Sequence, residues 1–127
     1  MPLSYTIDRD LRVVVERGSG VLSEEDLYSS RERMQADPAF NPRFAELVDL
    51  TEVTDIQVSV PVMARFARTA SFAPGVRRAI VGASEKQYDV AQMLATFSEP
   101  HHQIVHVFRD RAIAEVWLSE RRPDEWA

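Results

Sequence analysis

Hydrophobic residues recur at two periods along the chain, and the change of period divides it into expected strands and helices. Near the start, apolar and polar residues alternate in LSYTID (3–8) and in DLRVVVE (10–16). The polar segment Asp8-Arg9-Asp10 connects these two runs. Alternation of this kind is typical of half-buried strands. We therefore expect an antiparallel β-hairpin that ends at the glycines of Gly18-Ser19-Gly20.

After the hairpin, short apolar runs alternate with segments that begin like helices. Ser23 precedes three acidic residues, and Ser84 precedes Glu85-Lys86-Gln87, a capping-box pattern. Such residues satisfy the free backbone N–H groups of a helix's first turn. The expected elements are a helix over 23–36, a strand over 45–50, a helix over 60–70, a strand over 78–83, a helix over 85–98, a strand over 103–108 and a helix over 110–118.

This order, ββαβαβαβα, predicts an α/β fold. The later strands are apolar throughout, as are strands that are covered on both faces. Right-handed crossovers then give a mostly parallel sheet of about five strands, with the hairpin at its edge and helices on both faces. The sequence has no repeat, low-complexity segment or interior linker, so we expect a single domain over residues 1–127.

Composition and charge narrow the function classes. The net charge of −5, with acids and bases interspersed, argues against nucleic-acid binding, which depends on neutralising phosphates. The absence of cysteine excludes disulfides and thiolate sites. The N-terminus does not resemble a signal peptide, and no apolar run approaches the roughly 20 residues that cross a bilayer. We therefore expect a soluble cytoplasmic protein without a membrane span.

The common catalytic and cofactor motifs are missing from the sequence. Its four glycines form neither GxGxxG nor GxxxxGK[ST], and it contains no GxSxG or HExxH. His102 and His106 are four apart, but they fall where a strand begins, and no carboxylate is placed to complete a metal site. We expect no cofactor, no metal and no enzymatic activity.

Several motifs together resemble a known family. They are GVLSEEDL, DPAFNP, LVDLTEVTDI, RRAIVGAS and VFRDRAIAEVWL. In this order they are similar to bacterial SpoIIAA-like, or STAS-like, proteins, a fold that includes anti-sigma-factor antagonists and the cytoplasmic domains of sulfate transporters. The resemblance covers nearly the whole chain and implies a non-enzymatic regulatory or scaffold module that acts through protein–protein contact. The fold is also likened to SEC14-type lipid-binding domains, which implies the alternative of a carrier or sensor of a small apolar or lipid-like ligand.

The resemblance implies a counterpart in the family for Ser59. In the antagonists, a serine in the loop after an aspartate-ended strand is phosphorylated by a partner kinase. Laid on this chain, that pattern places Asp49 at the strand end and Ser59 at the phosphorylated serine. Gln57, Val58 and Val60 depart from the residues that flank the family's serine. We therefore interpret Ser59 as a helix cap, with phosphorylation as the alternative.

A second candidate surface follows from the fold class. In open parallel sheets, ligands bind beyond the carboxyl ends of the strands, where the chain order reverses. Asp49, Thr51, Ser84 and Arg109 fall there in the expected fold, and we interpret them as a ligand or partner surface. Asp110, next to them, is expected to cap the final helix.

The helix expected from Glu85 has an unusually wide apolar face. Val90, Met93 and Phe97 extend this face, so that apolar residues occupy roughly 220° of the circle, against the ≳100° that packing on a sheet requires. Neighbouring helices and loops can cover the excess. The alternatives are an interface in a homodimer and an apolar groove for a ligand. The expected partners are therefore a second copy of the chain, a regulatory protein or a lipid-like ligand.

Overall fold

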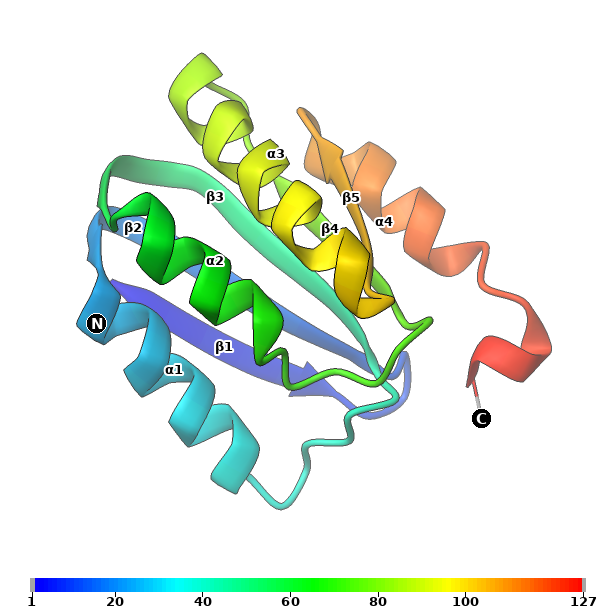
Figure 1. The fold of residues 1–127 in the computed structure, drawn as a ribbon. Coiled ribbons are helices and arrows are strands. Elements are labelled where there is room, and N and C mark those ends of the chain that lie inside the picture. Colours follow the sequence, from blue (N-terminus) through cyan, green and yellow to red (C-terminus); the bar gives the residue numbers. More distant parts are fainter. Residues whose placement is uncertain (1, 127) are drawn as a thin grey trace.

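A five-stranded sheet runs through the middle of the computed structural model, which describes residues 2–126 (Figure 1). The strands are β1 Leu3–Asp8, β2 Val13–Ser23, β3 Ala45–Gln57, β4 Arg77–Val81 and β5 Ile104–Phe108. They lie in the order β1-β2-β3-β4-β5, and only β1 is antiparallel to its neighbour. The helices are α1 Glu24–Ala36, α2 Val60–Arg68, α3 Glu85–Ser98 and α4 Arg111–Ser119, with 3-10 turns η1 Glu99–His101 and η2 Pro123–Trp126.

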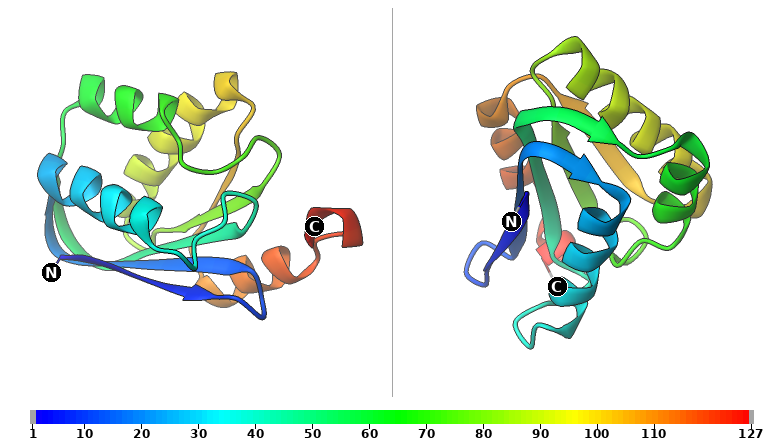
Figure 2. Two further views of the ribbon diagram at one scale, coloured as in Figure 1. Left: turned by 90° about the horizontal axis from the view of Figure 1, so that it is seen from below. Right: turned by 90° about the vertical axis from the view of Figure 1, so that its left-hand side faces the viewer.

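The four α-helices are divided unequally between the two faces of the sheet. Helices α1, α2 and α3 connect successive parallel strands and lie together on one face (Figure 2). Helix α4 follows the last strand and lies on the other face. The α/β class, the mostly parallel sheet and the helices on both faces are confirmed. The crossovers, however, cover one face only, because the chain adds each new strand at the same edge.

Both central strands are longer than the sequence predicts. We expected Gly18-Ser19-Gly20 to end the second strand, but β2 continues through them to Ser23, with register shifts beside Ser19 and Val21. We also expected β3 to end at Leu50, but it pairs with β2 as far as Gln57. Backbone N–H and C=O groups of β2 and β3 hydrogen-bond to each other along this extension. This pairing holds the polar ends of both strands in the sheet.

The helix starts agree with the expected capping residues. Ser23 and Ser84 each form a complete capping box, with Asp26 and Gln87 as the partners three residues later. Asp110 accepts a hydrogen bond from the backbone N–H of Ala112 at 2.7 Å. These caps fix where the chain leaves each strand, and so they orient the helices on the sheet.

The core has one apolar layer on each side of the sheet. On the α4 side, Ala114 and Leu118 pack against Leu47 and its neighbours on β2 and β4. On the other side, Ala91 of α3 packs in a cluster that includes Leu50. A third cluster under α1 contains Val14, Met34 and Phe72. The layer beneath α2 is incompletely filled and contains a cavity.

Candidate functional site

A cavity of about 80 Å³ lies between the sheet and the three helices on its crossover face. Its walls are mainly apolar. From the strands they include Leu22, Leu50 and Ile80, and from the helices Met63, Phe66 and Leu94. A buried space with walls of this kind favours apolar groups over water.

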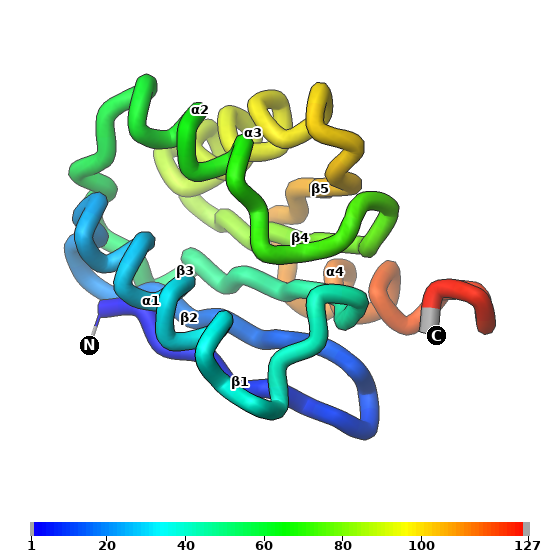
Figure 3. The backbone as a smooth tube through the Cα atoms, turned by 60° about the horizontal axis from the view of Figure 1, so that its bottom comes forward, coloured from blue at the N-terminus to red at the C-terminus, as the bar shows by residue number. Residues whose placement is uncertain are grey.

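The cavity exists because α2 does not pack directly against the sheet. This helix is nine residues long and packs mainly against α3. Figures 2 and 3 show α2 raised above the strands, whereas α1 lies alongside β1 and β2. The inner side of α2 provides Met63 and Ala67, which form the roof of the cavity.

Four ionisable side chains line the same apolar cavity. They are Glu16 on β2, Arg31 on α1, Glu46 on β3 and Arg78 on β4. Glu16 and Glu46 are only 8% and 5% exposed. Glu46 and Arg78 lie opposite each other in neighbouring parallel strands, and Arg78 Nε donates to Glu46 Oε1 at 2.9 Å. Burying charged groups is costly, so this cluster is the least expected feature of the core.

The two carboxyl groups of the cluster have opposite pKa shifts. Burial, together with the nearby charge of Glu46, raises the pKa of Glu16 well above its usual value. Burial also acts to raise the pKa of Glu46, but Arg78 and a hydrogen bond with Glu16 outweigh it and lower that pKa. Of the two carboxyl groups, Glu16 therefore holds a proton more strongly, and when protonated it donates a hydrogen bond to the carboxylate of Glu46.

Arg31 connects this cluster to α2. Its Nη1 donates to Thr69 Oγ1 at 2.9 Å, and its Nη2 donates to the backbone oxygen of Phe66 at 2.8 Å. The guanidinium also lies over the Phe66 ring, 3.5 Å from the centroid. Burial lowers the pKa of Arg31 to about 10, so the group stays charged at neutral pH. One side chain thus holds the C-terminal end of α2 and faces the buried acids.

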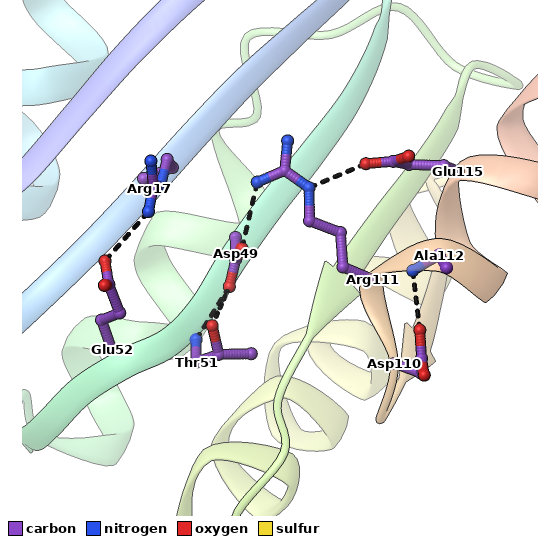
Figure 4. Close-up of polar contacts among 8 residues, drawn as sticks. All are labelled: Arg17, Asp49, Thr51, Glu52, Asp110, Arg111, Ala112 and Glu115. Atoms are coloured by element: carbon purple, nitrogen blue, oxygen red, sulfur yellow. Dashed lines mark hydrogen bonds and ion pairs between the residues drawn. The ribbon is translucent and has the colours of Figure 1, made fainter.

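A different polar cluster lies on the α4 face of the sheet (Figure 4). Asp49 is 7% exposed and accepts hydrogen bonds from the backbone N–H of Thr51 at 2.9 Å and from its hydroxyl at 2.6 Å. Arg111 Nη1 lies 3.1 Å from Asp49 Oδ2, and its Nε lies 2.8 Å from Glu115 Oε1. Burial would raise the pKa of Asp49, but the bonds from Thr51 and Arg111 outweigh it and lower that pKa.

The structure brings the predicted surface residues together only in part. Asp49 and Thr51 are in contact, whereas Ser84 caps α3 and Arg109 stacks over Tyr88, 4.0 Å from the ring centroid. Two premises of that prediction are wrong. Asp49 lies within β3 and does not end it, although it is level with Val81, the last residue of β4. The strand order also never reverses, so the sheet offers no reversal point at which a ligand would bind.

Ser59 caps α2, as the sequence predicts. Its Oγ accepts a hydrogen bond from the backbone N–H of Val62 at 3.4 Å, and the side chain is exposed. The strand before it ends at Gln57, so no long loop separates the two elements. Phosphorylation of Ser59 stays an alternative, and the cap explains the residue without it.

The wide apolar face of α3 contacts both the sheet and α2. Val90, Met93 and Phe97 are half-buried. Val90 lines the cavity beneath α2, and α2 packs against α3. The second helix gives part of this face a neighbour within the monomer, and a homodimer interface through these residues stays a prediction.

The histidines lie in two different settings. His102 ends the turn η1 with a left-handed backbone, whereas His106 stacks on Trp117 of α4 with 4.4 Å between ring centroids. In the described part of the chain, no group of three or more histidine, aspartate or glutamate side chains is placed to hold a metal.

Sequence reasoning missed the buried cluster. The available signal was a charged residue inside an apolar strand: Glu46 within AELVDL, and Glu16 directly after three valines. A strand covered on both faces has no side where a charge meets water, so such a residue needs a partner. The partner Arg78 is 32 residues away from Glu46, and only the strand pairing brings the two together.

Comparison with known proteins identifies the fold. The structure is similar to the crystal structure of an uncharacterised protein of the DUF3478 family with a SpoIIAA-like fold from Shewanella loihica PV-4. The TM-score is 0.63 at 20% sequence identity, and the match covers 91% of this chain and 93% of that chain. The chain therefore has a SpoIIAA-like fold, as its motifs predict. No family model and no curated protein matches the sequence. None of the described helices is long and apolar enough to cross a membrane.

Proposed function

We propose that this STAS-like module is a non-enzymatic carrier or sensor of a small ligand with an apolar body and a polar end. The observation that supports this proposal is the mainly apolar cavity beneath α2, with Glu16, Arg31, Glu46 and Arg78 in its wall. Ligand sites commonly combine apolar walls with a few convergent polar groups that fix the orientation of the ligand. The contacts within the cluster are hydrogen bonds and ion pairs, which suit the recognition of a polar head group.

The energetic cost of the cluster supports the same proposal. Replacing a buried ion pair with apolar residues is often neutral or stabilising, so a buried pair is weak evidence of a purely structural role. Here the ionised groups line a space instead of filling it, and α2 leaves that space open. A ligand that filled the space would add packing contacts and would use the polar groups already buried there.

A cavity-filling variant tests the proposal. Ala67 is buried on the inner side of α2, and Ala67→Leu should occupy part of the cavity. Ala112→Leu adds the same atoms at an exposed position of α4 and serves as the control. Native mass spectrometry of freshly purified protein should show a bound apolar molecule, or uptake of 1-dodecanol, in the original protein and the control. The Ala67→Leu variant should bind at least tenfold less, a difference of about 1.4 kcal/mol.

Two results would contradict the proposal. Equal binding by all three proteins would place the ligand elsewhere, and failure of the original protein to bind any of a panel of apolar alcohols and acids would remove the carrier function. Near-ultraviolet circular dichroism of the Ala67→Leu variant separates loss of the cavity from loss of folding.

The α4 face supports protein–protein contact as a second candidate function. Ile113 and Val116 on α4 are 60% and 58% exposed, and Leu11 in the β1–β2 turn is 58% exposed. A groove of about 330 Å³ beside α4 is lined by Leu11 and Leu118 together with charged residues. Ile113 and Val116 do not line this groove, so the exposed apolar side chains of α4 themselves favour an interaction surface.

Self-association gives a direct test of this second candidate. If a second copy binds this face, Ile113→Glu and Val116→Glu together should convert a dimer into a monomer, as measured by light scattering with size-exclusion chromatography. Thr54→Glu changes an exposed residue of β3 and serves as the control. A dimer that persists in the double variant would exclude the α4 face from that interface, and Met93→Glu with Phe97→Glu would then test the α3 face.

A further inference from the structure

We infer that the ligand of the cavity is a monoanion, a carboxylate with an apolar tail, whose head group binds between Arg31 and Arg78. This inference rests on the proposed carrier function and names the class of ligand. It is carried by the charges that line the cavity and by the contacts that each of the two arginines makes.

The charges that line the cavity do not balance when the proton is on Glu16. Arg31 and Arg78 then contribute two positive charges, and Glu46 contributes one negative charge. The excess of one positive charge lies in a mainly apolar cavity, where an uncompensated charge is costly. A monoanionic head group would restore neutrality. A phosphate monoester, whose second pKa is about 6, would carry close to two negative charges at neutral pH. It would therefore leave the cavity with a net negative charge.

The hydrogen bonds of the two arginines show where such a head group would bind. Arg78 uses Nε for Glu46, and its Nη1 donates to the uncharged amide oxygen of Gln103 at 3.0 Å. Arg31 donates to the uncharged oxygen atoms of Thr69 and Phe66. A carboxylate offers stronger, charge-assisted and bidentate bonds to a guanidinium than these neutral acceptors do.

The same contacts explain how the cavity would admit a tail. A volume of about 80 Å³ is well below the roughly 300–1,000 Å³ of ordinary ligand sites. Arg31 ties the C-terminal end of α2 to α1, and Gln35 adds a bond to Ser71 just beyond α2. A head group that takes over the hydrogen bonds of Arg31 would release this end of α2. Because α2 packs mainly against α3, it could then move away from the sheet and enlarge the cavity.

Glu16 makes the binding of an anion depend on pH. The charged groups that face it are Glu46 on β3, Arg78 on β4 and Arg31 on α1. When Glu16 loses its proton, the cluster becomes neutral, and an incoming carboxylate meets a second negative charge. Binding should therefore weaken as pH rises, and Glu16→Gln, which mimics the protonated acid, should remove this dependence.

The test compares three probes that share one tail: dodecanoate, 1-dodecanol and dodecyltrimethylammonium, each below its micelle concentration, by isothermal titration calorimetry at pH 6.5 and 8.5. Dodecanoate is ionised at both values, since an ordinary carboxyl titrates near 4.3. We expect dodecanoate to bind at least tenfold more tightly than the other two at pH 6.5. In the original protein its affinity should fall as pH rises, and in Glu16→Gln its affinity should stay constant.

Arg31→Gln should lower dodecanoate affinity about tenfold without lowering 1-dodecanol affinity, because it removes the bonds that hold α2 down. Arg68→Gln, on the exposed side of α2, should change neither affinity. Equal affinity of the original protein for all three probes would overturn the anion inference and leave the carrier function standing. Binding of none of them would overturn both. The comparison of probes uses the unaltered protein, so it decides the question even if a variant fails to fold. Acetate, which lacks the tail, should not bind measurably, and comparable binding of acetate would overturn the assigned ligand class.

Discussion

Two acidic residues of β3 show how one strand serves two different environments. Glu46 and Asp49 are three residues apart, so their side chains point to opposite faces of the sheet. Glu46 pairs with Arg78 beneath the crossover helices, and Asp49 pairs with Arg111 of α4. Each acid is nearly buried and each has a lowered pKa, because an arginine and further hydrogen bonds stabilise the charged form.

The lowered pKa of Asp49 predicts a loss of stability in acid. A carboxyl group whose pKa is lower in the folded state stabilises the fold above its unfolded value, about 3.9, and loses this contribution as pH falls through the folded value. Asp49→Asn should lower the free energy of unfolding by about 1–2 kcal/mol at pH 7, measured by urea denaturation, and by much less near pH 3. Glu115→Gln, which alters the exposed partner of the same Arg111, should cost less than about 0.5 kcal/mol. An equal loss for Asp49→Asn at both pH values would exclude the charge as the cause.

At the scale of residues, the sequence predicts local roles better than distant pairings. Ser59, Ser84 and Asp110 are identifiable as caps because the backbone N–H groups that they accept lie within three residues. Glu46 and Arg78 gain their roles from strand pairing across the sheet, and no local pattern encodes that contact. The caps were therefore predicted, and the buried cluster was not.

At the scale of elements, β2 shows why a glycine is a weak stop signal for a strand. Gly18 lies in the paired strand, and a Cβ atom there would be 2.7 Å from Cγ2 of Val53 on β3. The glycine is needed because a neighbouring side chain occupies the space, and the strand continues through it. Gly20, by contrast, has a φ of +65° and open space around it, so its role is conformational.

This difference predicts unequal effects of substitution at the two glycines. Gly18→Ala should lower the free energy of unfolding by about 1–3 kcal/mol, because the added methyl group forces Val53 to shift in a packed core. Gly20→Asn should cost less, since asparagine tolerates the left-handed backbone and meets no neighbour. Urea denaturation of both variants measures the difference. A Gly18→Ala protein as stable as the original would show that β2 and β3 are less closely packed at this point.

Helix α3 shows that the role of a wide apolar face cannot be assigned without knowing which helices lie next to it. Its periodicity predicts the bounds of the helix, and these agree with the structure. The side chains beyond the sheet-facing stripe could not be assigned from the sequence, because α2 and a partner molecule need the same kind of surface. The position of α2 against α3 depends on the order of the strands, which the pattern of elements does not encode.

At the scale of the whole molecule, the strand order decides where binding is favoured. The sequence predicts the α/β class and the parallel pairing, because apolar strands alternate with capped helices. The order β1 to β5 without reversal removes the expected site at the strand ends and collects α1, α2 and α3 on one face. Three helices share that face with one cavity, while α4 leaves exposed apolar residues on the other. The two proposed functions therefore use opposite sides of one sheet.

The raised pKa of Glu16 ties the stability of the whole fold to pH. A carboxyl group whose pKa is higher in the folded state holds its proton longer than the unfolded chain does, so its contribution is fully present below the unfolded value of about 4.3. That contribution is lost as pH rises toward the folded value, at about 1.4 kcal/mol for each unit between the two. Above the pI of about 5.2 the growing negative charge, −5 at pH 7, adds repulsion.

Glu16→Gln removes the titrating group and keeps a hydrogen-bond donor toward Glu46. We expect its free energy of unfolding, measured by urea denaturation without ligand, to match that of the original protein near pH 4 and to exceed it by about 1 kcal/mol or more at pH 8. Glu52→Gln, at an exposed ion pair with Arg17, should shift stability by less than about 0.5 kcal/mol at both values. If the Glu16→Gln and original proteins lost stability in parallel between pH 4 and pH 8, Glu16 would not carry the proton, and the excess positive charge that favours an anionic ligand would be absent.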